Sequence, residues 1–223
     1  MSVITIFHGS NHIITKPEYF VGKPYNDYGK GFYCTNEIEM AKEWACKENT
    51  NGFVNEYQLN ISDLKILDLQ DSKYNVLNWI ALLLKNRKFE LSDPVSITAR
   101  KYILDNYLID TSDYDIIIGY RADDSYFSYA QSFVANSLSV RLLEEALKLG
   151  ELGIQVALVS EKAFENIKYI NAFSVEKEIY YSKYINRDLS ARKYFFENIK
   201  NKQFSLDDVF IVDIMRKKLK NND

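Results

Sequence analysis

The sequence predicts an α+β fold, in which strands and helices intermingle along the chain. Short runs of branched and aromatic residues are typical of strands, and longer stretches carry apolar residues at helical spacing. A regular alternation of the two would instead indicate a doubly wound parallel sheet. The chain has 223 residues, of which 47% are hydrophobic, and no linker-like or repeated segment divides it. We therefore expect a single domain over residues 1–223.

The first half of the chain is predicted to hold strands and helices in mixed order. Strands are expected over residues 4–8, 29–35, 53–59 and 65–69. Asn36 is predicted to cap a helix whose apolar face is formed by Met40, Ala41, Trp44 and Ala45. Further helices are expected over residues 74–86 and 95–107, the second opened by Asp93 and Pro94.

The second half begins with an unbroken apolar run over residues 114–120, which is typical of a strand buried on both faces. Helices are expected over residues 126–134 and 140–149, the latter between a Ser139 cap and a Gly150 stop. The remaining expectations are strands over 154–160 and 173–181, a short helix over 163–167, and two charged helices near 186–198 and 206–219.

Composition excludes several classes of protein. A net charge of −3 provides no general attraction for nucleic acids or anionic membranes. Two cysteines, Cys34 and Cys46, are too few for a disulfide framework, and their spacing does not indicate a metal site. The N-terminus lacks the features of a signal peptide, and the longest apolar stretch, residues 79–84, is too short to cross a membrane. We expect a soluble, cytoplasmic protein without a metal.

Two segments near the N-terminus could carry chemistry. His8, Gly9 and Ser10 end the first strand, where a glycine lets backbone groups approach a planar ligand and an imidazole can bond a ribose hydroxyl. In the second segment, Gly29 and Gly31 precede Phe32 and Tyr33, whose rings could stack on a ligand. The structural alternatives are a strand end followed by a turn, and a glycine-containing strand with core aromatics.

These segments carry a resemblance to a known superfamily. A strand ending in Phe-His-Gly-Ser (7–10), roughly twenty residues of loop, and Gly-Lys-Gly-Phe-Tyr-Cys-Thr (29–35) resemble the poly(ADP-ribose) polymerase-like ADP-ribosyltransferases, and in detail a bacterial family of formerly unknown function. The resemblance continues through residues 118–127 and 149–156, and so covers about the first 170 residues. It implies a split mixed or antiparallel sheet, an NAD-binding core over 1–170, and a C-terminal strand and helices over 171–223.

The resemblance also implies roles for individual residues. His8 would bond the adenosine ribose, the backbone of Gly9 would hold the nicotinamide carboxamide, and Ser10 would support that pocket. Tyr33 would stack on the nicotinamide ring. The other residues assigned to NAD+ binding are Gly31, Phe32, Arg121 and Tyr126.

One position departs from the superfamily pattern. Its catalytic glutamate falls on Gln155, although a carboxylate there would stabilise the positive charge that develops on the ribose. Asp123 and Asp124 are the candidates to replace it, and Arg121 could hold a phosphate or order these carboxylates. The alternative is that these three residues form a solvated loop and a helix cap.

The resemblance implies a mono-ADP-ribosyltransferase that uses NAD+ as substrate, acts as a bacterial toxin and is paired with a neutralising antitoxin. Gln155 favours a different hypothesis, a module that binds NAD+ or ADP-ribose without turnover. A third hypothesis is nucleic-acid binding through the basic residues 216–220. The acceptor stays open among proteins, nucleic acids and small molecules.

Overall fold

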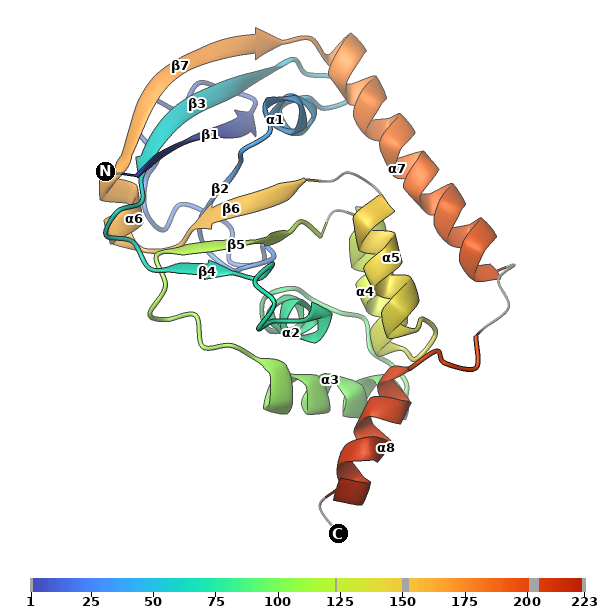
Figure 1. The fold of residues 1–223 in the computed structure, drawn as a ribbon. Coiled ribbons are helices and arrows are strands. Elements are labelled where there is room, and N and C mark those ends of the chain that lie inside the picture. The colour runs from blue at the N-terminus through green and yellow to red at the C-terminus, as the bar shows by residue number, and fades with distance from the viewer. Residues whose placement is uncertain (1, 123, 150–152, 201–204, 222–223) are drawn as a thin grey trace.

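The computed structural model describes residues 2–122, 124–149, 153–200 and 205–221. Its centre is a seven-stranded sheet with the order β4-β5-β6-β2-β1-β3-β7 (Figure 1). The strands are β1 (Val3–Ser10), β2 (Phe32–Thr35), β3 (Gly52–Asn60), β4 (Ile66–Asp68), β5 (Ile116–Tyr120), β6 (Ile154–Leu158) and β7 (Ile167–Val175). The pair β4–β5 is parallel and the other pairs are antiparallel. The predicted α+β class is therefore confirmed, with a mixed sheet.

The sheet opens between its two central strands, β1 and β2. These strands share one residue pair, Phe7 with Thr35, whereas β1 pairs with β3 over its whole length. On the other side, β2 pairs with β6 from Phe32 to Thr35. Figure 1 shows the result: β1, β3 and β7 splay away from β2, β6, β5 and β4. The loop of residues 11–31 connects the two halves across this opening.

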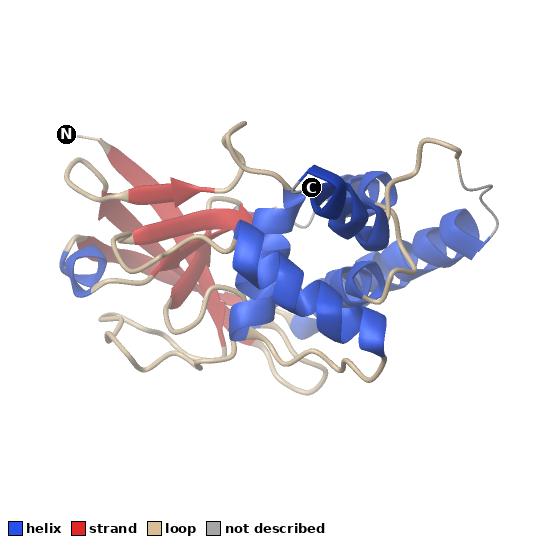
Figure 2. Cartoon of the chain, turned by 90° about the horizontal axis from the view of Figure 1, so that it is seen from below, coloured by secondary structure: helices blue, strands red, loops and turns tan. Residues whose placement is uncertain are grey.

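Most of the helices gather at one end of the sheet (Figure 2). They are α2 (Val76–Asn86), α3 (Pro94–Tyr107), α4 (Asp124–Val134), α5 (Val140–Leu149) and α8 (Ile211–Asn221). The central one is α2, since Trp79, Ile80 and Leu83 are buried in the largest apolar cluster, which α3, α4 and α5 complete. Burial of such side chains contributes about 2 kcal/mol each and holds the helices against the sheet.

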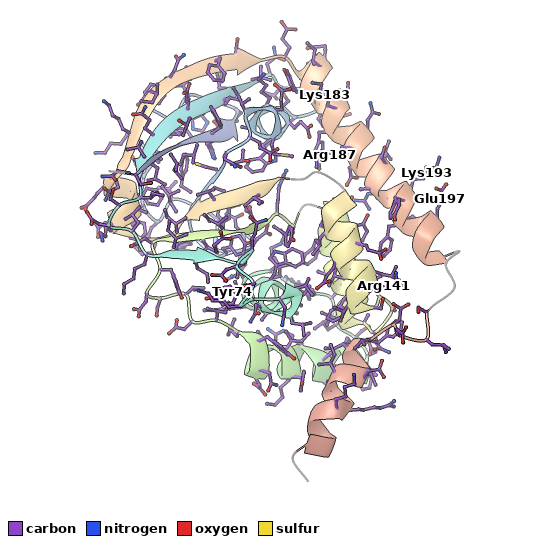
Figure 3. All side chains as sticks on the ribbon, in the orientation of Figure 1. Tyr74, Arg141, Lys183, Arg187, Lys193 and Glu197 are labelled. Carbon is purple, nitrogen blue, oxygen red and sulfur yellow. The ribbon has the colours of Figure 1, made fainter. Side chains whose placement is uncertain are left out.

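The remaining three described helices make different contacts. α1 (Ile38–Ala45) packs on β1 and β3, and α6 (Glu161–Glu165) links β6 to β7. α7 (Lys177–Lys200) passes α1 and reaches α4 and α5. Arg187 of α7, labelled in Figure 3, donates to Glu43 of α1 at 2.6 Å. None of the helices in the described parts of the chain has the length and apolarity that a membrane span requires.

Two predicted helix starts are confirmed by their capping bonds. Asp93 accepts a hydrogen bond from the Ser96 N–H at 2.9 Å, with Pro94 in the first turn of α3. Ser139 accepts from the Leu142 N–H at 3.3 Å at the start of α5. The predicted stop at Gly150 falls outside the described residues. These caps satisfy N–H groups that the first helical turn leaves without a partner.

The strand expected over residues 173–181 is wrong in position. β7 pairs with β3 from Ile167–Leu59 to Val175–Gly52, so the strand starts directly after α6. The chain is helical from Lys177, and the helix expected over 186–198 is the second half of α7. Tyr180 and Tyr181 are typical strand residues, but here they pack from the first turns of α7 against an apolar cluster around α1. Tertiary packing has overridden local propensity.

Two smaller expectations around β2 also differ from the structure. Residues 29–31 are a turn rather than strand, because Gly29 has a φ of +82° and donates to the Asn26 carbonyl. Glu37, not Asn36, holds the N-cap position of α1. The turn before α1 is instead fixed by Thr35, whose hydroxyl oxygen accepts from the Glu37 N–H at 3.1 Å.

Candidate functional site

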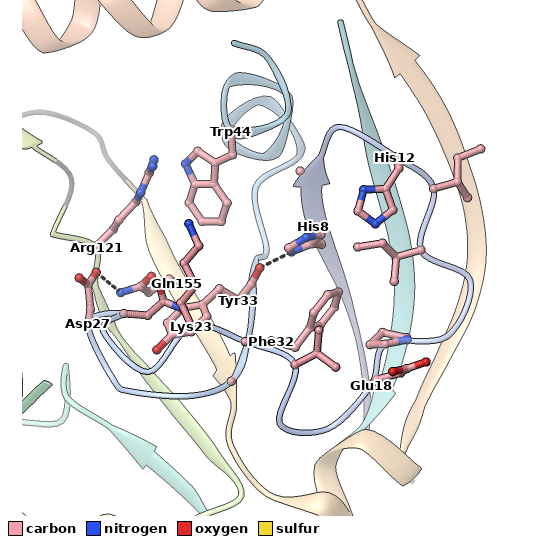
Figure 4. A pocket seen from close by; sticks show the side chains of 18 of the residues that line it. His8, His12, Glu18, Lys23, Asp27, Phe32, Tyr33, Trp44, Arg121 and Gln155 are labelled. Atoms are coloured by element: carbon pink, nitrogen blue, oxygen red, sulfur yellow. Dashed lines mark hydrogen bonds between the residues drawn. The ribbon is translucent and has the colours of Figure 1, made fainter. Parts of the chain in front are cut away.

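A cavity of about 1030 Å³ lies at the opening between β1 and β2, and we call it the split cavity. Much of its wall comes from the loop of residues 11–31. The rest comes from strands, from α1 and α7, and from residues that follow α2 and β5. Lining residues include His8, Gly9, Gly31, Phe32, Tyr33, Trp44, Arg87, Arg121, Gln155 and Tyr184. Figure 4 shows His8, Tyr33, Trp44, Arg121 and Gln155 around the same space. Its size is that of a pocket for a small organic ligand or cofactor.

His8 is held as a neutral acceptor. Its Nδ1 lies 2.6 Å from the Tyr33 carbonyl oxygen, which can only accept, so Nδ1 carries the proton and Nε2 keeps its lone pair. The ring also stacks on Phe32, with centroids 4.3 Å apart. Burial lowers the pKa of His8 from 6.5 to about 4, although the bond to Tyr33 opposes the shift. Near neutral pH, Nε2 can therefore accept a hydrogen bond from a ligand hydroxyl.

Tyr33 closes the turn that precedes its own strand. Its hydroxyl donates to the Gly29 carbonyl at 2.7 Å and accepts from the Tyr28 N–H at 3.0 Å. Burial raises the pKa of Tyr33 above its ordinary value of 10.0, so the phenol stays protonated. Because the hydroxyl is committed to the turn, the face of the ring is what Tyr33 offers to the cavity. Trp44 brings a second aromatic ring to the same cavity (Figure 4).

Gln155 lies at the inner end of the cavity and is 3% exposed. Its Nε2 donates to Asp27 Oδ2 at 2.8 Å, a bond drawn in Figure 4, and to the Tyr120 carbonyl at 3.1 Å. Asp27 comes from the loop and is itself buried. The cavity therefore contains a buried carboxylate next to the Gln155 amide.

Asp27 is fixed by partners from three other parts of the chain. Its Oδ1 accepts from Arg87 Nη1 at 2.6 Å, and its Oδ2 accepts from the Ala122 N–H at 2.8 Å as well as from Gln155. Arg87 also donates to the Ala122 carbonyl at 3.0 Å and stacks over the Phe127 ring. These contacts tie the loop to α2 and to the segment after β5.

Cationic groups surround the rest of the cavity. Lys16, Lys23, Arg87 and Arg121 line it, together with the carboxylates of Glu18 and Asp27. Arg121 lies over the Trp44 ring, 4.6 Å from its centroid. A surplus of positive charge in a partly enclosed space favours anionic ligands such as phosphates. Aromatic faces, a neutral imidazole and cations together suit a nucleotide that carries a planar ring.

Only some of the residues predicted from sequence line this cavity. His8, Gly9, Gly31, Phe32, Tyr33, Arg121 and Gln155 do so. Ser10 instead bonds the loop, because its hydroxyl donates to the His12 carbonyl and accepts from Asn55. Tyr126 is 1% exposed and packs in the core. Asp123 lies outside the described residues, and of Asp124 only the backbone, at the start of α4, is described.

Gly9 also has a structural reason to be glycine. A Cβ at this position would lie 2.1 Å from the Ala41 carbonyl oxygen and 2.7 Å from the Ala45 nitrogen, both in α1. The close approach of β1 to α1 thus depends on the missing side chain. The same approach brings Trp44 of α1 to the cavity beside His8.

Sequence reasoning missed Asp27, Arg87 and Trp44. Trp44 was assigned to the apolar face of a helix, which fits its position but not its contact with the cavity. Asp27 precedes a Tyr-Gly pair in a segment typical of a turn, where an aspartate is ordinary. No local pattern therefore distinguishes Asp27 from an ordinary turn residue.

Comparison with known proteins finds a matching family, but the description of that family names no activity. The sequence model of a family described as "Protein of unknown function (DUF3990)" matches residues 4–169. This range contains β1 from its second residue, β2 to β6, and the cavity-lining residues apart from Tyr184 of α7. No curated protein and no solved structure matches the chain.

Proposed function

This chain belongs to the DUF3990 family, and we propose that it is an NAD+-dependent mono-ADP-ribosyltransferase with an ADP-ribosyltransferase-like fold. The observation that carries the proposal is the meeting of His8, Tyr33 and Gln155 in the split cavity, from β1, β2 and β6. These are the three positions that the resemblance to ADP-ribosyltransferases identifies. By the same resemblance, we propose a cytoplasmic toxin that modifies a cellular macromolecule and is neutralised by a partner protein.

The cavity offers a matching group for each part of NAD+. The rings of Tyr33 and Trp44 offer flat faces to the nicotinamide. His8 Nε2 accepts a bond from a ribose hydroxyl, because Nδ1 is occupied by the Tyr33 carbonyl. Arg121 and Lys23 supply positive charge for the pyrophosphate.

The proposed reaction breaks the bond between ribose C1′ and the nicotinamide nitrogen. The electron pair of that bond leaves with nicotinamide, and positive charge develops on the ribose. A nucleophilic atom of the acceptor then forms a new bond to C1′ and loses its proton. The protein contributes by orienting the ribose and by placing hydrogen-bond acceptors near the developing charge.

Nicotinamide release from NAD+ tests this proposal directly. Wild-type protein, with and without cell lysate as acceptor, is compared with His8→Ala and with Thr5→Ala, an exposed substitution on the same strand. We expect His8→Ala to lower kcat/KM by about 100-fold, because it removes an oriented hydrogen-bond partner. Thr5→Ala should behave as wild type. Neither release nor NAD+ binding by the wild type would contradict the proposal.

Gln155 supports a second function, binding of NAD+ or ADP-ribose without turnover. An amide brings no charge to the developing cation, and both N–H groups of Gln155 are already engaged. Isothermal titration calorimetry of NAD+ binding, together with the nicotinamide-release assay, distinguishes the two functions. Binding of NAD+ that His8→Ala weakens, with no nicotinamide released in any lysate, would favour the binding module.

A further inference from the structure

We propose that Asp27 is a positioning residue that makes Gln155 a hydrogen-bond acceptor for a ribose hydroxyl of NAD+. In this pair, the amide contacts the substrate and the carboxylate behind it supplies the negative charge. Together they replace one glutamate. The inference rests on the proposed function and assigns a role to a loop residue outside the motifs that carry the resemblance.

The orientation of the Gln155 amide follows from the two hydrogen bonds that its nitrogen donates. Nε2 has two hydrogens, and it lies 2.8 Å from Asp27 Oδ2 and 3.1 Å from the Tyr120 carbonyl oxygen. Both partners are acceptors, so a flipped amide would face two oxygens with its own oxygen. Donation to both partners uses the two N–H groups and leaves Oε1 as the group that can meet a ligand. Oε1 can only accept.

The partners of Gln155 are themselves fixed. Asp27 is 5% exposed, and Arg87 Nη1 and the Ala122 N–H hold its two oxygens at 2.6 and 2.8 Å. The Tyr120 carbonyl also accepts from the Tyr28 hydroxyl at 2.8 Å and from Trp79 Nε1 at 3.0 Å. The amide of Gln155 is therefore oriented by a rigid frame before any ligand arrives.

The carboxylate has an electronic effect as well as a steric one. An N–H that donates to a carboxylate in a poorly solvated site polarises its amide and places more negative charge on the carbonyl oxygen. This charge would face a ribose hydroxyl while the glycosidic bond breaks. Arg87, Ala122 and Gln155 hold the Asp27 carboxylate in one orientation, with Oδ2 directed at the Gln155 amide. Its role is to act through Gln155.

Exchanging the two side chains tests the pair. We expect Asp27→Asn to lower kcat for nicotinamide release by about 10-fold to 100-fold while KM changes less than about 3-fold. Gln155→Glu would set two carboxylates at hydrogen-bond distance, which is tolerated only while they share a proton. Activity of this variant should therefore fall as the pH rises from 6 to 9, unlike that of the wild type.

The double variant Asp27→Asn/Gln155→Glu distinguishes a role of Asp27 in orienting residue 155 from a role in holding the loop of residues 11–31. It restores one carboxylate and one amide in exchanged places, and we expect its kcat at pH 8 to exceed that of either single variant by at least about 5-fold. Recovery is partial, because an asparagine nitrogen cannot accept from the Ala122 N–H. The matched control is Asp71→Asn, which changes an exposed carboxylate paired with Lys73 and should behave as wild type.

The outcomes distinguish this inference from the proposed function. Wild-type release together with an unaffected Asp27→Asn variant would overturn the Asp27–Gln155 pair alone. A loss in Asp27→Asn with no recovery in the double variant would also overturn it, since Asp27 would then act only by holding the loop. If the wild type neither releases nicotinamide nor binds NAD+, the proposed function fails and this role fails with it. Far-ultraviolet circular dichroism confirms that each variant is folded.

Discussion

The two halves of the split cavity are built by different means. The strand half, His8, Tyr33 and Gln155, is placed by backbone pairing within the sheet. The loop half, residues 11–31, has no strand or helix and is placed by side chains. Asn55 and Tyr57 hold Ile14 at one end, while Arg87 and Gln155 hold Asp27 at the other.

This difference predicts which substitutions should displace each half of the cavity wall. Ladder hydrogen bonds join backbone atoms and survive most changes of side chain. A loop held by side-chain bonds loses a fixed point with each anchor that is removed. We therefore expect the strand half to resist all but steric changes, and the loop half to respond to single polar substitutions made outside the loop.

The largest effect is expected in the strand half, for Gly9→Ala. The new Cβ would lie 2.1 Å from the Ala41 carbonyl oxygen, so β1 and α1 must move apart. We expect the free energy of unfolding to fall by about 3 kcal/mol, measured by urea denaturation. Thr5→Ala on the same strand is the control and should cost less than about 1 kcal/mol. Equal costs at the two positions would mean that α1 adapts freely.

A smaller loss of stability, with a local effect on the loop half, is expected for Asn55→Ala. Asn55 is fully buried, its Oδ1 accepts from the Ile14 N–H at 2.8 Å, and its Nδ2 donates to Ser10 Oγ at 3.1 Å. Removal of this side chain should lower the free energy of unfolding by about 2 kcal/mol and speed hydrogen exchange at the Ile14 amide. Asn60→Ala, on the same strand, is the matched control. Unchanged exchange at Ile14 would show that the loop needs no such anchor.

The strand half should also show an acid-sensitive contribution from His8. Because its pKa is about 4 in the folded protein and 6.5 ordinarily, the unfolded chain binds a proton between these values that the folded chain does not. Stability should therefore fall as the pH drops from 6.5 to about 4, by about 3 kcal/mol from this group. Below that pH the contribution levels off.

The comparison of wild type with His8→Gln isolates this group. The variant cannot bind a proton at this position, so its unfolding free energy should decline less steeply between pH 6.5 and 4. Both proteins lose stability from their carboxylates, and only the difference between the two curves is informative. Parallel curves would show that the imidazole is not shielded from water in the folded protein.

The same contrast explains how far the sequence could predict the fold. Strands with apolar runs, such as residues 4–8, 53–59 and 154–160, were found within a few residues, because burial and alternation are visible locally. β7 was displaced toward Tyr180 and Tyr181, whose aromatic rings favour a strand but pack from a helix. What fixes β7 is its register with β3, which no local pattern reveals.

The candidate site divides in the same way. His8, Tyr33 and Gln155 lie on strands, where motif and element could be predicted together. Asp27 lies in the loop, and its partners Arg87 and Gln155 are far away in the chain. Only the folded chain brings them together. Ser10 and Tyr126 were assigned to the ligand by motif, and the structure uses them in the loop and the core instead.

The smallest effect is expected where α7, outside the family match, meets the cavity. Tyr184 lines the cavity one turn before Arg187, whose Nε and Nη2 donate to Glu43 at 2.9 and 2.6 Å. A double-mutant cycle of Arg187→Ala and Glu43→Ala should give a coupling of about 1 kcal/mol, since both side chains are largely buried. The same cycle on the exposed pair Lys101–Asp105 is the control and should give a smaller coupling energy.

If this ion pair holds Tyr184 in place, Arg187→Ala should weaken NAD+ binding a few-fold, without changing kcat, by loosening one wall of the cavity. A coupling near zero would instead mean that apolar packing of Tyr180 and Tyr181 against α1 positions the helix. In that case α7 would behave like the strand half, insensitive to single polar changes, and dependence on side-chain anchors would be a property of the loop rather than of everything that surrounds the cavity.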